Sequence, residues 1–330
     1  MQYGAELSHA RLCRARASGC NASSRSDASC SPAEAEAAAL ASERRAAQIR
    51  AEYAQRWARS GAGYIRGYLQ NGSRLGGWGQ MENVIPLVVG LAPAQTAATD
   101  ASLEQLVRQA EHALTEIRTQ MPEAFWRYGR PDDALHIMRG FRTDPRKTYP
   151  EVSFTFVENC VVGLLGLAPD AAAHAIRTRH RLGTGMGWAA AENILVGAHT
   201  IAVRHDLGDG AGGSAGAGAM RRLRTTVSHT AHTAPPPTGG PNGGAWGYDH
   251  ADSRSPVAPM PPGPPPVPAP LLKLTAQFAG RHTEVYLDGV KITGTTVVFQ
   301  EGDSRLPLTE VNVTVAVGKT VVVEAKSSSS

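Results

Sequence analysis

Residues 207–270 constrain the fold more than any other part of the chain, because they cannot form a packed core. They include the runs GDGAGGSAGAGA, APPPTGGPNGG and PMPPGPPPVPAP. This composition buries too little apolar surface to offset the loss of chain entropy, and proline runs favour the extended polyproline II conformation. The sequence therefore predicts a long disordered Gly/Pro-rich linker that divides the 330 residues into two folded pieces.

The piece before the linker, residues 31–206, has helical patterning. Ser31 precedes Pro32 and Glu34, a capping box with proline at the first helical position, and predicts a helix to about residue 59. Further helices are expected near 80–91, 100–117 and 131–141. The run 152–167 is apolar nearly all round, which favours a helix buried on most sides and leaves a buried strand pair as the alternative. Residues 193–205 read as a β-hairpin.

The two ends of the chain differ in kind. Residues 1–30 are expected to be a disordered leader: they lack the apolar stretch of a secretory signal and are rich in Arg and Ser, so the cytoplasm or an organelle is favoured over secretion. In residues 271–326 apolar and polar side chains alternate, which predicts a β-sandwich-like accessory module of antiparallel strands. A piece this short is marginal alone, so we expect it to dock on the helical piece or to complete a sheet begun by 193–205.

Charge and composition argue against several classes of partner. The net charge is +4 and no arginine stripe alternates with aromatic residues, so no nucleic-acid partner is expected. No run reaches ~20 apolar residues, so no membrane partner is expected either. The cysteines lack metal-ligand spacing, and no Walker loop or dinucleotide-binding fingerprint occurs, so neither a metal nor a cofactor is predicted.

The stretch 149–205 carries a resemblance to a known group of enzymes. It contains Gly-Leu-Leu-Gly at 163–166, Pro-Asp-Ala at 169–171, Gly-Trp at 187–188 and a Val-Gly…Val segment at 196–203. This order resembles the end of six-hairpin (α/α)6 glycoside hydrolases, which include trehalase-like, mannosylglycerate-hydrolase-like and rhamnosidase-like enzymes.

Two other segments add to the resemblance. Residues 76–93 are similar to the penultimate inner helices of these enzymes, and FAGRHTEVYLDG at 278–289 is similar to their accessory β-module. The resemblance implies a mainly α fold, a partial (α/α)6 toroid of antiparallel helical hairpins, plus a small C-terminal antiparallel β-module. A full toroid has twelve helices and the sequence predicts about five, so the chain would hold the C-terminal part of a catalytic barrel, with the general acid upstream.

Glu151 is the catalytic candidate, because it stands just before the last predicted inner helix and after Tyr149. In an inverting glycosidase one carboxyl group is protonated and the other activates water. Glu151 would be the general base or a ligand of sugar hydroxyls, with Tyr149 beside it as a substrate-binding residue. The alternative is a carboxylate that stabilises a helix N-terminus.

The glycine-rich loop at 60–79 supplies further candidate substrate-binding residues. Trp78 could stack on a sugar ring while Glu82, one turn into the next helix, holds its hydroxyls; Trp78 could equally plug the barrel floor. Arg66 and Tyr68 of the same loop are weaker candidates. Glu158 lies within the apolar run, where a structural, hydrogen-bonded carboxylate is favoured over a functional one.

The leading hypothesis is a glycoside-hydrolase-like protein that cleaves a glycosidic bond of an oligosaccharide or glycoside substrate, with inversion. The alternative is a non-catalytic carbohydrate-binding or scaffold remnant that lacks the general acid. A third reading is a gene fragment without a stable fold. The discriminating observations are turnover and glycan binding.

Overall fold

We analysed a computed structural model of the chain. The structure describes residues 2–22, 31–59, 63–75, 79–208, 222–231, 271–282, 284–292, 296–298 and 307–326.

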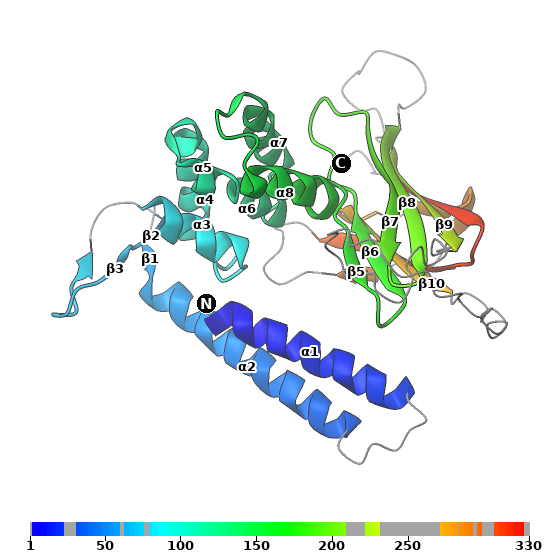
Figure 1. Cartoon of the computed structure of the whole chain (residues 1–330), viewed down its shortest axis with the longest axis horizontal. Coiled ribbons are helices and arrows are strands. Elements are labelled where there is room, and N and C mark those ends of the chain that lie inside the picture. Colours follow the sequence, from blue (N-terminus) through cyan, green and yellow to red (C-terminus); the bar gives the residue numbers. More distant parts are fainter. Residues whose placement is uncertain are drawn as a thin grey trace, which may run out of the picture.

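The N-terminal part is an antiparallel pair of long helices, α1 (Gln2–Ala22) and α2 (Pro32–Arg56), which lie side by side (Figure 1). The Ser31 hydroxyl accepts a hydrogen bond from the Glu34 N–H at 3.3 Å, which confirms the predicted N-cap. The expectation of disorder over 1–30 is wrong for residues 2–22. The only large apolar side chains of α1 are those of Tyr3, Leu7 and Leu12, so its stability depends on packing against α2, which a pattern within 1–30 cannot reveal.

Two short hairpins and a cluster of short helices follow. The hairpins are β1 (Ala58–Arg59) with β2 (Gly63–Tyr64), and β3 (Gly67–Tyr68) with β4 (Arg74–Leu75). The helices are α3 (Gln80–Val88), α4 (Ala97–Gln109), α5 (Thr115–Arg118), α6 (Met121–Arg127), α7 (Pro131–Gly140) and α8 (Pro150–Glu158). Fully buried Leu87, Leu106, Met121 and Phe125 form the centre of the core of this helical cluster.

The prediction of a partial helical toroid is wrong. The described helices of the cluster are short, and only α1 and α2 form a long antiparallel pair (Figure 1). The run expected to be a helix buried on most sides is α8 followed by a π-helical turn, Asn159–Leu164. Its outer face is open, with Phe154 73% and Val157 59% exposed. Apolar composition alone did not show which sides of this helix have partners.

The C-terminal half is a sandwich of two sheets that share one apolar core. One sheet has the order β13-β14-β10-β6-β5, with β5 (Ala168–Asp170), β6 (Ala175–Arg179), β10 (Leu272–Ala279), β13 (Thr296–Val298) and β14 (Leu308–Val315). The other has the order β12-β11-β15-β9-β8-β7, with β7 (Trp188–Val196), β8 (His199–Gly208), β9 (Arg222–Ala231), β11 (Glu284–Leu287), β12 (Val290–Ile292) and β15 (Lys319–Lys326).

The sandwich is larger than the small accessory module expected, because its strands begin at Ala168. The predicted hairpin at 193–205 lies within the β7–β8 hairpin, which turns between Val196 and His199. Strands from 271–326 enter both sheets: β15 pairs with β9, which pairs with β8. Strand β9 falls inside the predicted linker, so that prediction is wrong for residues 222–231. The rest of the linker lies outside the described residues.

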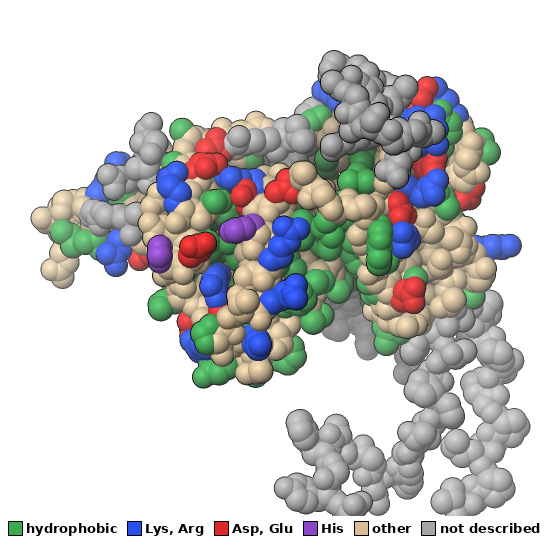
Figure 2. Space-filling view, turned by 90° about the horizontal axis from the view of Figure 1, so that it is seen from above, with side chains coloured by type: hydrophobic (Ala, Val, Ile, Leu, Met, Phe, Trp, Pro, Cys, Tyr) green, Lys and Arg blue, Asp and Glu red, His purple; other side chains and the backbone are tan. Residues whose placement is uncertain are grey.

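The helical cluster and the sandwich meet at a shared apolar seam. Leu164, in the π-helical turn, and Met186 each pack against both cores. Figure 1 shows α8 running toward the strands at this junction. On the face shown in Figure 2, acidic and basic side chains are interspersed over the molecule. Among the described helices, none combines the length and apolar character needed to cross a membrane.

Candidate functional site

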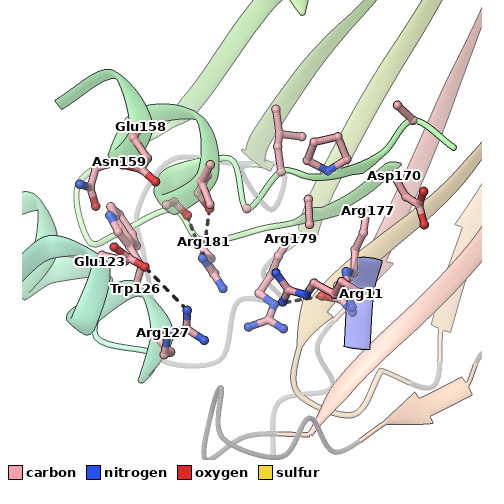
Figure 3. A pocket seen from close by; sticks show the side chains of 18 of the residues that line it. Arg11, Glu123, Trp126, Arg127, Glu158, Asn159, Asp170, Arg177, Arg179 and Arg181 are labelled. Atoms are coloured by element: carbon pink, nitrogen blue, oxygen red, sulfur yellow. Dashed lines mark hydrogen bonds and ion pairs between the residues drawn. The ribbon is translucent and has the colours of Figure 1, made fainter. Parts of the chain in front are cut away.

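A cavity of about 830 Å³ lies where the helical cluster meets the sandwich (Figure 3). Its walls come from α1, α6, the end of α8 with the π-helical turn, β5, β6 and β10. The segments that carried the resemblance form part of this wall: Gly163 and Gly166 line it, and so do Pro169, Asp170 and Ala171. A large concave site between two structural units is where ligands usually bind.

The helical side of the cavity carries two carboxylates, Glu123 from the first turn of α6 and Glu158 from the end of α8. Burial raises the pKa of Glu123; the cation of Arg127, 3.7 Å away, opposes this rise, and the negative charge of Glu158 adds to it. The negative charge of Glu158 therefore favours the protonated form of Glu123. Glu158 itself is exposed to solvent.

Trp126 lines the cavity beside Glu123 (Figure 3). Its indole ring is only 2% exposed, although it lines the cavity, and its Nε1–H has no hydrogen-bond partner among the described residues. A Cβ atom on Gly163 would lie 2.3 Å from the Trp126 ring, so glycine is required for this close approach. An unsatisfied buried donor is costly, so a group that accepts from it gains affinity.

The opposite side of the cavity is basic because of strand alternation. Successive side chains of a strand point to opposite faces. Arg177 and Arg179 of β6, and Arg181 just after it, all line the cavity. Between them, Thr178 and His180 are buried on the other face.

The inward-facing pair is hydrogen-bonded within the sandwich. The Thr178 hydroxyl donates to the Leu165 carbonyl oxygen at 2.8 Å, and His180 Nε2 lies 3.1 Å from the Asp206 carbonyl oxygen. Because these contacts fix the register of the backbone, they also fix the direction of the three arginines.

Arg179 is the most enclosed of the three, with 5% of its surface exposed. Its Nε–H donates to Gln277 Oε1 at 3.0 Å, across the parallel pairing of β6 with β10. Gln277 in turn donates to Glu310 of β14. The backbone of Gly166 approaches Arg179 so closely that a Cβ would lie 2.6 Å from the Arg179 Cβ. Gln277 of β10 thus holds the buried guanidinium, and Gly166 packs against the backbone and Cβ of Arg179.

Two of the residues singled out from the sequence lie together, but not in this cavity. Glu151 stands in the first turn of α8, half-exposed, 3.4 Å from the guanidinium of Arg146. Arg146 lies over the ring of Tyr149, 4.3 Å from its centroid, and also pairs with Glu116. Glu151 and Tyr149 therefore both contact Arg146, within a surface ion-pair cluster.

The loop residues form a second, separate group. The guanidinium of Arg66 is 3.5 Å from the carboxylate of Glu82, which stands in the first turn of α3. The Tyr68 hydroxyl donates to the Arg56 carbonyl oxygen, and its ring meets Trp57 edge-on at 5.3 Å. Trp78 lies outside the described residues. None of the described members lines the cavity.

Sequence reasoning missed the residues that the cavity brings together. In the sequence, Glu123 resembles any acidic residue in the first turn of a helix, and the apolar run around Glu158 favours a structural role for that carboxylate. The alternation of arginines in Arg-Thr-Arg-His-Arg at 177–181 has the period of a strand. The residues between the arginines are also polar, so the apolar–polar alternation that normally predicts a strand is missing. Among the described residues, no group of three or more His, Cys, Asp or Glu side chains could hold a metal ion.

No family model matches the sequence, and no curated protein matches it. Among solved structures, the chain is similar to a dextranase of glycoside hydrolase family 31 from Flavobacterium johnsoniae, in complex with isomaltotriose. The TM-score is 0.24 at 9% identity, and the match covers 46% of this chain and 17% of the dextranase. At that TM-score the likeness supports no conclusion about this chain.

Proposed function

We propose that the chain is a glycoside-hydrolase-like protein and that the cavity at the junction binds its carbohydrate substrate. The observation that carries the proposal is the position of two carboxylates, Glu123 and Glu158, in a cavity of about 830 Å³. Gly163 and residues 166–171, from the segment that resembles six-hairpin glycosidases, form part of the wall of that cavity.

The two carboxylates suit the two roles of glycosidic hydrolysis. A general acid must be protonated near neutral pH, and the pKa of Glu123 is raised by burial. In the proposed reaction, Glu123 donates its proton to the glycosidic oxygen as the C1–O bond breaks. Glu158 accepts a proton from the water whose oxygen attacks C1 from the opposite face. This course inverts the anomeric carbon.

This assignment moves the general base from Glu151 to Glu158. Glu151 does not line the cavity and is paired with Arg146, so it serves the N-terminus of α8 and the ion pairs around it. The resemblance thus supports the cavity as the substrate site, and the geometry of the cavity favours Glu123 and Glu158 as its catalytic acids.

A second candidate is a non-catalytic carbohydrate-binding protein. The observation that favours it is the ion pair of Glu123 with Arg127, because a neighbouring cation favours the ionised carboxylate and weakens it as an acid. Under this reading the cavity binds sugar without turnover.

The test combines hydrolysis and binding by the full chain. A panel of oligosaccharides and aryl glycosides is screened for reducing-end release, and the released anomer is followed by NMR. The variants Glu123→Gln and Glu158→Gln are compared with Glu52→Gln, an exposed carboxylate on α2 that pairs with Arg56.

Catalysis predicts that both cavity variants lose at least ~10²-fold in rate, the ordinary contribution of a positioned acid or base, while Glu52→Gln is unchanged. Saccharide binding without hydrolysis supports the second candidate. If no saccharide is bound or hydrolysed, both are wrong.

A further inference from the structure

The charge of the cavity indicates which sugars it would accept. Six arginines line the cavity against three carboxylates. Arg14 is paired with Glu43 of α2, with Nη2 2.9 Å from Oε2, so it is balanced from outside the cavity. The remaining wall still has an excess of guanidinium groups, which favours a negatively charged ligand.

The arginines are grouped rather than scattered. Arg177, Arg179 and Arg181 occupy alternate positions, so their Cα atoms are about 7 Å apart along an extended chain. Figure 3 shows Arg11 beside Arg177 and Arg179 at one end of the cavity, with Glu123 and Glu158 at the other end.

Two of these arginines are positioned by their surroundings. Arg179 is held by Gln277, and Nη1 of Arg181 donates to the Gly163 carbonyl oxygen at 3.1 Å. A guanidinium held in this way keeps its planar fork in place, so little side-chain entropy is lost when it binds a planar acid group.

We propose that the cavity binds a uronic acid residue, with its carboxylate on the arginines of 177–181 and its glycosidic bond toward Glu123 and Glu158. This proposal rests on the proposed function and adds the class of sugar to it. A uronate presents a singly charged, planar carboxylate that accepts paired N–H donors from arginine. Its hydroxyls supply donors for the cavity carboxylates.

The carboxylates of the cavity favour a singly charged anion over a doubly charged one. Glu158 and Asp170 line the same cavity, and each would repel a phosphate dianion more strongly than the single charge of a uronate. Figure 3 shows Asp170 near Arg177 and Arg127 beside Glu123, so both ends of the cavity hold both signs of charge. The arginines are in excess at the end formed by Arg11, Arg177 and Arg179, and a single negative charge followed by a neutral polyhydroxylated body matches that excess.

The experiment measures binding to the full chain by calorimetry at low and physiological salt. The probes are trigalacturonate, its fully methyl-esterified form, maltotriose, sulfate and phosphate. The variants are Arg177→Gln and Arg181→Gln, with Arg74→Gln in the exposed β3–β4 hairpin as the matched control. Arg177 is exposed, so its replacement preserves the fold, and a thermal melt verifies this for both variants.

The proposal predicts that trigalacturonate binds at least about tenfold more tightly than its methyl ester, the loss expected from one charge-assisted hydrogen-bonding group. Arg177→Gln and Arg181→Gln should each weaken the binding of trigalacturonate by a similar factor and leave the affinity for the ester unchanged. Arg74→Gln should have no effect.

Two results would overturn the inference, and they are distinguishable. If trigalacturonate, its methyl ester and maltotriose bind with equal affinity, and neither cavity variant changes that affinity, the uronate proposal is wrong and the proposed carbohydrate function still stands. Binding of sulfate or phosphate with no saccharide bound at all removes both the uronate and the carbohydrate function.

Discussion

Gly163 lies directly against the indole ring of Trp126, and this contact joins the π-helical turn to α6. A Cβ at position 163 would be 2.3 Å from Cδ1 and 2.4 Å from Nε1 of the ring. Since Trp126 is 2% exposed and packed in the helical core, any shift of the ring disturbs the packing of that core.

Replacement of this glycine should therefore destabilise the protein. Gly163→Ala forces the ring or the turn to shift, and overpacking of this kind costs ~1–3 kcal/mol in the free energy of unfolding. The measurement is chemical denaturation followed by circular dichroism. The matched control is Gly140→Ala at the end of α7, where no atom lies within 4 Å of the added Cβ. A loss of stability in the control as large as that at position 163 would contradict the steric explanation.

The buried histidines of the sandwich should make its stability depend on pH. His205 is fully buried, with Nε2 3.1 Å from the Leu165 carbonyl oxygen and Nδ1 2.9 Å from the Thr225 hydroxyl. Burial, with the nearby charge of His180 adding to it, lowers the pKa of His205 from its ordinary 6.5 to about 3. Burial first, and then neighbouring His229, likewise lower the pKa of His199.

The direction follows from proton linkage. Below pH 6.5 the unfolded chain binds a proton at His205 that the folded protein excludes. The free energy of unfolding is therefore unaffected by this residue above pH 6.5 and falls as the pH is lowered toward 3. The loss is about 1.4 kcal/mol per pH unit, or about 2 kcal/mol at pH 5 from this residue. Denaturation at pH 7 and pH 5 measures it. His205→Asn should reduce the pH dependence, and His136→Gln, which removes an exposed histidine of α7, should not. Equal stability at both pH values would rule out the linkage.

The stability of the protein should depend on the ion pair between the buried carboxylate of Asp144 and Arg118. The Asp144 side chain is fully buried, pairs with Arg118 of α5, and accepts the Arg146 backbone N–H at 2.7 Å. Arg118→Met leaves that charge buried and unpaired, which costs ~3 kcal/mol in unfolding free energy. Arg142→Met, at an exposed position two residues before Asp144, provides the comparison. A change below ~0.5 kcal/mol for Arg118→Met in thermal and chemical melts would mean that the pair is dispensable.

The open face of α8 should tolerate polar substitution. Phe154 is 73% exposed, so Phe154→Ser should change the unfolding free energy by no more than ~0.5 kcal/mol. Phe125, fully buried in α6, gives the contrast: Phe125→Ala should cost ~3–5 kcal/mol by leaving a cavity. Comparable losses for the two variants, measured by urea denaturation, would show that the face of α8 is covered in solution.

Local signals in the sequence predicted local structure well. Ser31 with Pro32 marked the start of α2, and the alternation at 193–205 marked the β7–β8 hairpin. The fold class could not be predicted, because it depends on which distant segments pair. Strand β6 is the clearest case, since its neighbour in the sheet, β10, follows only after β7, β8 and β9 in the sequence.

The candidate site could be predicted from the sequence even less well than the fold. Glu123 carries no distinguishing signal within its helix, and its raised pKa arises from burial and from Glu158, which only the folded chain brings near. Arg179 reads as one of several solvated arginines in a connector. It is buried because Gln277 accepts its Nε–H and Gly166 lets the backbone approach. These are tertiary causes that spacing in the sequence does not encode.

The parallel pairing of β6 with β10 sets an order of events for a chain leaving the ribosome. Arg179 meets Gln277, its partner, only after a further 98 residues have been synthesised. Until then β6 has only β5 beside it, and contacts as remote as that with β10 form slowly. The helical cluster can assemble from local contacts during that interval, so newly made chains pass through a stage with a packed helical core and an unfinished cavity.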